Sequence, residues 1–216
     1  MNRTLKTSIE KNHPGVTIVV ASKYLTTPTD FRPFLDANHR VFGENRVETL
    51  LEKRAWFQDE AIEWHYIGTL QTKKVKKVVD AIDVLHSLDR IKLAEEIDKR
   101  RQGKPLPCFV QVNISGEAQK HGIEPDAVPA FLDAVQSFEK LTVIGLMGMA
   151  EETDDDARIR HQFETLVQLR DAVSTTYPTV KRLSMGMTQD YRIALELGAD
   201  TLRLGRVMLR EDTHGT

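Results

Sequence analysis

A lysine closes an otherwise apolar stretch near the N-terminus, in the sequence VVASKY (residues 19–24). Lysine is rarely buried without a partner, and burial lowers the pKa of an amine because desolvation disfavours its charged form. A half-desolvated amine at Lys23 could attack a carbonyl carbon and form a Schiff base. The alternative is a lysine whose stem packs while its ammonium reaches solvent. At this position the sequence leaves both interpretations open.

Two glycine-containing segments near the C-terminus could bind an anion. They read LSMGMT and RLGR. Ser184 offers a hydroxyl, Gly186 and Gly205 let backbone amides approach a ligand, and Arg206 adds positive charge. Thr188 is a predicted N-cap for the helix that follows. Each glycine alone could simply permit a tight strand-to-helix turn, so the pair of segments is the stronger signal.

The elements that must position these residues follow from the hydropathy pattern. Most of the stretches between the short apolar segments are long enough for a helix. Valines and an isoleucine recur at helical spacing in 69–82, 155–175 repeats apolar residues in the same way, and Asp89 is a predicted N-cap for a helix over 89–101. The eight predicted strands are TIVVASKY, RVFGEN, EWHYIG, DVLHSLD, PCFVQVN, TVIGLMGM, KRLSMGM and DTLRLG.

Apolar strands that alternate with amphipathic helices indicate a parallel sheet covered by helices. Eight such units predict the α/β class and a (β/α)8 TIM barrel, which we expect to form a single domain over 1–216. An open doubly wound sheet is the alternative. The sequence has no G-x-G-x-x-G after the first strand, which argues against it.

In a barrel of this kind the active-site residues lie at the C-terminal ends of the strands. Phosphate sites are commonly built there from the loops after strands 7 and 8, where Ser184 and Gly205 fall. Arg203 shares the face of Gly205 and needs a partner, such as a carboxylate or the ring nitrogen of a heterocycle. A Schiff-base lysine, a phosphate corner and an arginine between them describe pyridoxal 5′-phosphate (PLP). The other strand ends that we expect at this mouth are 43–45, His65, Asn113, Met147 to Met149 and 184–187.

Composition narrows the function classes. The net charge of −2 gives no bulk attraction to nucleic acid or to an anionic membrane. No apolar run approaches the roughly 20 residues of a membrane span, and the N-terminus lacks the apolar core of a secretory signal. Cys108 is the single cysteine and is expected to be a core residue in a cytoplasmic protein. The histidines show no metal-ligand spacing, so we expect no metal site. The charge and the short apolar runs lead us to expect no nucleic-acid partner and no membrane partner.

Several stretches, in order, resemble the pyridoxal phosphate homeostasis proteins, which are similar to the N-terminal barrel of alanine racemase. The resemblance runs from about residue 17 to about residue 208. It implies a fold-type III PLP barrel in which Lys23 carries the cofactor as an internal Schiff base. The matching stretches are VVASKY, FGENRVETLLEK, WHYIGTLQTKK, VNISGEAQKHGI, GLMGM, LSMGMTQDYRIALELGAD and LRLGR.

The same resemblance assigns the remaining site residues. It implies phosphate contacts from Ser184, the backbone around Met185, Gly205 and Arg206, and it places Arg203 at the pyridine nitrogen. Asn45 and Ile67 would flank the cofactor, and Met147 belongs to the mouth. Lys120 resembles a secondary PLP-handling position, although an ordinary exposed lysine is the alternative. The chain departs from the family pattern at Lys73, Arg206 and Arg210.

Two functions compete. The resemblance implies a PLP carrier that acts in PLP homeostasis, without robust turnover, as a monomer that could supply apo-PLP enzymes. The alternative is a PLP-dependent amino-acid racemase. Racemisation needs two acid/base groups. Racemases of this type add a β-domain that brings a tyrosine, and no such domain is expected after residue 208. An arginine at the pyridine nitrogen also makes the ring a weaker electron sink.

Overall fold

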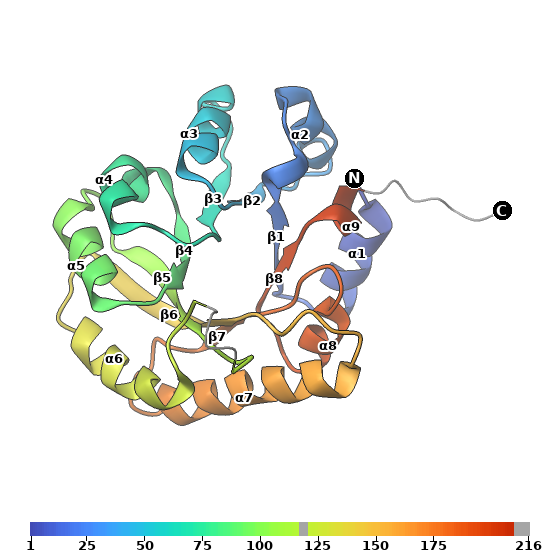
Figure 1. Ribbon diagram of the computed structural model, residues 1–216. Coiled ribbons are helices and arrows are strands. Elements are labelled where there is room, and N and C mark those ends of the chain that lie inside the picture. The colour runs from blue at the N-terminus through green and yellow to red at the C-terminus, as the bar shows by residue number, and fades with distance from the viewer. Residues whose placement is uncertain (117–120, 210–216) are drawn as a thin grey trace.

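The computed structural model describes residues 1–116 and 121–209, and its strands form a closed parallel barrel in chain order (Figure 1). The predicted barrel is therefore confirmed, and the open doubly wound sheet is excluded. The strands are β1 (Thr17–Ala21), β2 (Val41–Glu44), β3 (Glu63–Tyr66), β4 (Val84–Leu88), β5 (Leu106–Val112), β6 (Leu141–Gly148), β7 (Arg182–Ser184) and β8 (Thr201–Leu204).

Helices surround the strands, as Figure 1 shows. They are α1 (Arg3–Asn12), α2 (Pro28–Leu35), α3 (Val47–Trp56), α4 (Val75–Val78), α5 (Ile91–Arg100), α6 (Val128–Val135), α7 (Asp156–Ser174), α8 (Tyr191–Glu196) and α9 (Arg206–Leu209). The N-terminus lies beside α9, where the Asn2 amide donates to the Met208 carbonyl at 2.8 Å.

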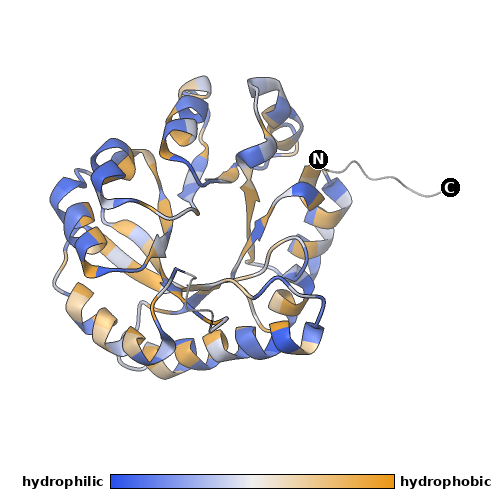
Figure 2. Cartoon of the chain, viewed as in Figure 1, coloured by the Kyte–Doolittle hydropathy of each residue, from blue (hydrophilic) through white to orange (hydrophobic). Residues whose placement is uncertain are grey.

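Two apolar regions stabilise the barrel. The large one lies between strands and helices, where the helices turn their apolar faces inward and keep polar residues outside (Figure 2). The small one fills part of the barrel interior with Val84, Phe109 and Met147. Interior side chains pack a barrel of this size completely, so ligands bind at its ends.

The first predicted strand is longer than the observed one. β1 ends at Ala21, and Lys23 lies in a 3-10 turn, Ser22–Tyr24, rather than in the strand. Its side chain is exposed, so the turn moves the lysine out of the sheet and over the mouth.

The helix predicted over 69–82 is broken. A 3-10 turn (Thr72–Lys74), the single turn of α4 and another 3-10 turn (Val79–Ala81) replace it. The apolar stripe on which the prediction rested is buried as expected. Its β-branched valines disfavour a long regular helix, because their χ1 angles are restricted there.

Both predicted N-caps are wrong by one or two residues. α5 has Arg90 at its N-cap position, because the Asp89 carboxylate is paired with the Arg90 guanidinium instead of the helix amides. α8 has Asp190 at its N-cap position. The Asp190 carboxylate accepts from the Met187 amide at 2.5 Å, which leaves the Thr188 hydroxyl free to face Gly205.

Candidate functional site

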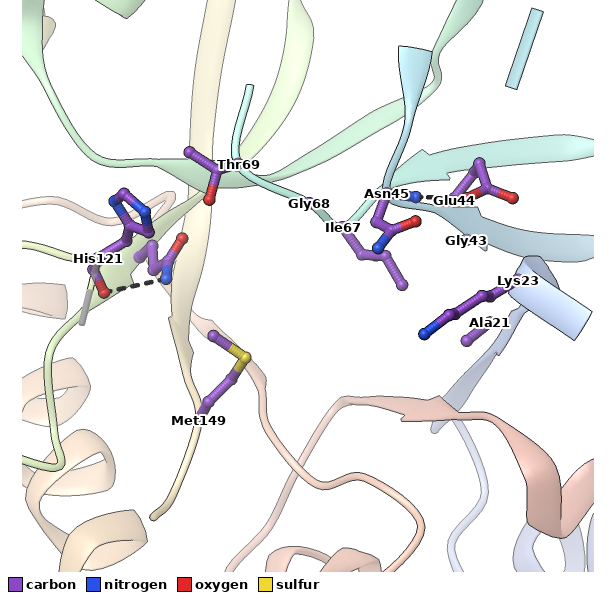
Figure 3. A pocket seen from close by; sticks show the side chains of 11 residues that line it. Ala21, Lys23, Gly43, Glu44, Asn45, Ile67, Gly68, Thr69, His121 and Met149 are labelled. Carbon is purple, nitrogen blue, oxygen red and sulfur yellow. Dashed lines mark hydrogen bonds between the residues drawn. The ribbon is translucent and has the colours of Figure 1, made fainter. Parts of the chain in front are cut away.

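Two cavities open at the C-terminal end of the barrel, and both are lined by Ala21 at the end of β1. The first has a volume of about 500 Å³ and is lined by Lys23, Asn45, Ile67, Gln111, His121 and Met149, among others (Figure 3). The second, of about 790 Å³, includes Tyr24, Thr188, Tyr191, Arg203, Gly205 and Arg206. The predicted lysine and the predicted phosphate corner therefore lie on adjoining parts of one mouth.

Lys23 points its amine into the first cavity (Figure 3). Within the part of the chain that the structure describes, this amine has no carboxylate partner; its nitrogen lies 5.6 Å from the centre of the Tyr24 ring. An amine that no carboxylate holds is available to condense with an aldehyde. The exposed position also fits the alternative of an ordinary solvated lysine. Whether Lys23 reacts therefore depends on which molecule binds at the mouth.

A buried ion pair fixes the backbone on both sides of this lysine. Lys53 on α3 donates to Glu44 Oε2 and to the Ser22 carbonyl, each at 2.7 Å. The Ser22 hydroxyl donates to Glu44 Oε2 at 2.9 Å, and Glu44 Oε1 accepts from the Asn45 amide at 2.9 Å. The side chains of Lys53 and Glu44 are 3% and 2% exposed. The pair thus clamps the turn that carries Lys23 to the end of β2.

The floor between Lys23 and Ile67 is built from close contacts at two glycines. A Cβ on Gly43 would lie 2.7 Å from the Val19 side chain, and one on Gly68 would lie 2.5 Å from the Asn45 carbonyl oxygen. The Tyr66 hydroxyl donates to that same carbonyl at 3.1 Å. Burial raises the pKa of Tyr66 to about 12, so this phenol stays protonated and holds the backbone of Asn45 in place.

Arg203 enters the second cavity from β8. Its side chain is buried, and Nη2 donates to the Gly148 carbonyl at 2.9 Å. Burial lowers the pKa of Arg203 to about 10, and the Asp190 carboxylate opposes that shift. The guanidinium therefore stays charged near neutral pH. Arginine carries five N–H donors, and the bond to Gly148 uses one of them.

Gly205 tests whether the second cavity fits a phosphate. A Cβ built there would meet nothing closer than the Ala21 Cβ and the Thr188 hydroxyl, both at 3.9 Å, and its φ is not positive. Neither packing nor backbone conformation demands a glycine, so the space is available to a ligand. The Gly205 amide lies 3.4 Å from the Thr188 hydroxyl, and the exposed Arg206 follows. A hydroxyl, an amide and a cation together suit an anion.

Gly186 has a purely structural reason to be glycine. Its φ is +95°, and a Cβ there would lie 2.7 Å from the Ala194 Cβ. The alternative interpretation of a tight turn is therefore sufficient for Gly186, although not for Gly205.

Three predicted site residues lie below the mouth. Ser184, Met185 and Met147 are at most 1% exposed and line neither of the two cavities. Met147 packs on Phe109 and Val84 in the barrel interior. The role of Ser184 as a phosphate contact stays a prediction, and its hydroxyl already has a partner in the barrel.

That partner belongs to a chain of hydrogen bonds that the sequence did not predict. Glu63 Oε1 lies 2.8 Å from His65 Nε2, His65 Nδ1 lies 2.8 Å from His86 Nε2, and His86 Nδ1 lies 2.9 Å from Ser184 Oγ. Three hydrogen bonds need three protons. With an ionised Glu63 and neutral rings, each histidine carries its proton on Nε2, and the Ser184 hydroxyl donates to His86.

The electrostatics favour a neutral His86. Burial is the main cause, and it lowers the pKa of His86 well below its usual value. The hydrogen bond from His65 lowers the pKa of Glu63, whose side chain is half-exposed at the opposite end of the barrel. His65 was expected at the mouth, but it is buried and lines neither cavity, and its two ring nitrogens bond to Glu63 and His86, as in a structural histidine.

Other expectations can be placed in the same way. Cys108 is fully buried, and burial raises the pKa of its thiol, which fits a core residue. Among the described residues no cluster of metal ligands occurs, and no described helix is long and apolar enough to cross a membrane. Lys120 and Arg210 lie outside the described residues.

Sequence reasoning missed several lining residues. Gln111 and His121 face the first cavity, and the Gln111 amide donates to the His121 carbonyl at 3.0 Å. Asn113 was expected at this strand end, and the period of two along β5 could have identified Gln111 as well. Lys53 was part of a quoted stretch, but no pattern showed that it reaches Glu44.

Known proteins are similar to this chain over most of its length. The family model described as "Alanine racemase, N-terminal domain" matches residues 8–211. A pyridoxal phosphate homeostasis protein of Aquifex aeolicus is 35% identical over 187 residues, which cover 85% of this chain and 82% of the relative. A protein of the same name from Helicobacter pylori (strain J99) is 34% identical over 218 residues and covers 96% of both chains.

Solved structures of similar proteins have the same fold. PipY of Synechococcus elongatus, solved with PLP bound, superimposes with a TM-score of 0.85 at 27% identity, covering 95% of this chain and 98% of PipY. Alanine racemase of Clostridium difficile shares the fold, with a TM-score of 0.73 at 12% identity, over 96% of this chain and 55% of the racemase. The chain therefore belongs to the alanine racemase N-terminal domain family, and within it to the pyridoxal phosphate homeostasis proteins.

Proposed function

We propose that this protein binds PLP at Lys23 and serves PLP homeostasis, by storing or delivering the cofactor, without robust catalytic turnover. One observation carries the proposal: a lysine amine with no carboxylate partner among the described residues lines a cavity that adjoins an arginine-lined cavity, in a chain similar to PipY, which is solved with PLP bound. PLP supplies an aldehyde that condenses with an amine to give a C=N bond and water.

The residues of the mouth divide the binding task between them. Lys23 supplies the amine, and Asn45 and Ile67 flank the ring. Gly205 and Arg206 take the phosphate, and the Thr188 hydroxyl beside Gly205 supports them. Charge-assisted hydrogen bonds to a phosphate contribute roughly 1.5–3 kcal/mol each, so this corner supplies much of the affinity.

Arg203 lines the same cavity, and in this proposal its guanidinium faces the ring nitrogen. Because a guanidinium donates and does not accept, it leaves that nitrogen unprotonated. An unprotonated ring withdraws fewer electrons, which lowers the acidity of an amine substrate's Cα proton. This arrangement supports a carrier rather than an enzyme.

The acid/base inventory supports the same conclusion. Racemisation requires a second group opposite the lysine. Among the described residues, Glu44 is already paired with Lys53, and the Tyr66 hydroxyl is bonded to Asn45. His121 lies across the cavity from Lys23 (Figure 3) and is the group that an amino-acid racemase, the second candidate, would use.

The remaining partners follow from the proposed role. A carrier would meet apo-PLP enzymes, act in the cytoplasm and function as a monomer. Neither nucleic acid nor membrane enters this role.

The decisive experiment follows the Cα proton. Holo-protein is incubated with a panel of amino acids in heavy water, and deuterium at Cα is measured by NMR. The carrier proposal predicts no exchange at enzymatic rates, although slow amine exchange at the cofactor is compatible with it. Exchange on the order of 1 per second or faster would overturn the carrier proposal, and its loss in His121→Ala together with inversion at Cα would support the racemase.

A further inference from the structure

A buried lysine on α3 has no role in the proposed function, although it lies directly behind the reactive turn. Lys53 continues the buried face of α3, after Val47 and Leu50 at spacings of three residues. That face normally carries apolar residues. A lysine there costs desolvation free energy, so its bonds deserve a specific explanation.

Every polar atom of this group is satisfied, which makes it a rigid unit. The Lys53 ammonium uses its three N–H donors on the Ser22 carbonyl, Glu44 Oε2 and, at 3.5 Å, the Ser22 hydroxyl. The Ser22 hydroxyl lies 3.1 Å from the Gly43 carbonyl and bonds to Glu44 Oε2. The ammonium and the carboxylate cancel each other's charge. Such fully bonded pairs fix geometry more than they add stability.

The atoms that this unit holds are those next to the proposed cofactor contacts. The Ser22 carbonyl belongs to the peptide bond that leads into Lys23, and the Asn45 amide belongs to the residue that flanks the ring. A reactive amine must be held near its target, because a misplacement of about 1 Å can cost a hundredfold in rate. The pair also keeps Glu44 from serving as a carboxylate partner for Lys23.

We propose that Lys53 and Glu44 are positioning residues that aim the Lys23 amine at the aldehyde of bound PLP. The inference rests on the proposed function and deepens it. It requires that loss of the pair weakens the covalent link at Lys23, while contacts with the ring and phosphate are retained.

Two ligands separate these effects. PLP carries the aldehyde, whereas 4′-deoxypyridoxine 5′-phosphate keeps the ring and the phosphate but cannot condense with an amine. The test variant is Glu44→Gln/Lys53→Met, because it removes both charges together and leaves no unpaired ion in the core. The matched control is Glu48→Gln/Lys74→Met, which removes an exposed pair at 3.0 Å that also involves α3.

The covalent fraction is trapped with borohydride and counted by intact mass, and the dissociation constant of the deoxy analogue is measured by fluorescence. We expect the trapped fraction at limiting PLP to fall about tenfold in the test variant, with the analogue's dissociation constant within twofold of wild type. The control should change neither.

Equal weakening of both ligands would mean general damage to the mouth and would overturn the inference. An unchanged trapped fraction would overturn it as well. Failure of the wild-type protein to trap PLP would instead overturn the proposed function, and the inference with it. The two failures are distinguishable because one is seen in wild type and the other only in the variant.

Discussion

Two buried polar networks lie in this barrel in opposite electrical states. The clamp behind Lys23 contains a full ammonium and a full carboxylate, at 2.7 Å, between the strands and α3. The chain of hydrogen bonds from Glu63 to Ser184 runs through the barrel interior, and burial lowers the pKa of its His86 well below the usual value, which keeps that ring neutral. Charge is placed where backbone atoms beside a reactive lysine must be held. It is avoided beside Arg203, where a second buried cation would be repelled.

The largest loss of stability is expected when one charge of the Lys53–Glu44 pair is removed. Lys53→Met leaves the Glu44 carboxylate buried without its cation, which typically costs about 3–5 kcal/mol in the free energy of unfolding. Glu44→Gln/Lys53→Met should recover about half of that loss or more. Urea unfolding at pH 7.5 measures both variants. If the double variant is as unstable as the single one, the clamp does not act as a charge pair.

Ser184 and Thr188 sharpen the comparison at the phosphate corner. Thr188→Val removes a hydroxyl beside Gly205, and we expect PLP to bind about tenfold more weakly while pyridoxal, which lacks the phosphate, is unaffected. Ser184→Ala removes the donor to His86 and should lower the free energy of unfolding by about 1–3 kcal/mol. A phosphate-selective loss in Ser184→Ala would instead support its predicted contact with the cofactor.

The hydrogen-bond chain through His86 predicts that the free energy of unfolding depends on pH, whereas the Lys53–Glu44 pair predicts no such dependence between pH 5.5 and 7.5. The folded-state pKa of His86 lies below its unfolded value, so the unfolded state binds the proton more tightly. The contribution to stability is complete above about pH 6.5 and is lost as pH falls below it, by up to about 1.4 kcal/mol per pH unit. Because His39 shifts in the same direction, the measurement is the difference between wild type and His86→Gln.

Unfolding free energies at pH 7.5, 6.5 and 5.5 give this difference. A His86→Gln variant with the full wild-type pH slope would show that the buried histidine does not stay neutral. The Lys53 and Glu44 double variant should keep the wild-type slope, since no histidine takes part in the clamp.

Much of the fold could be predicted from the sequence because hydropathy alone marks the eight strands. Short-range details could not. Asp89 looked like an N-cap, but its neighbour Arg90 competes for the carboxylate. The 69–82 segment has a correct apolar stripe, but valine-rich turns do not sustain a long helix. Local patterns show which residues are buried more reliably than which hydrogen bonds they make.

The site shows the same division. Lys23, Arg203 and Gly205 reach the mouth as their strand-end positions predicted. Ser184 is the last residue of β7, but it is fully buried and lines neither cavity. The pairing of His65 with His86, and of Glu44 with Lys53, depends on side-chain reach across elements. The position of a residue at a strand end does not show which residue of another element its side chain will contact.

The central claim is that Lys23 holds PLP, and chemical trapping tests it most directly. Purified protein is loaded with PLP, reduced with borohydride, digested and mapped by mass spectrometry, with Lys23→Ala treated in parallel. The account predicts a yellow protein whose reduced cofactor is on Lys23 and an unlabelled variant. A label on another lysine, or an unchanged absorbance band in Lys23→Ala, would contradict it.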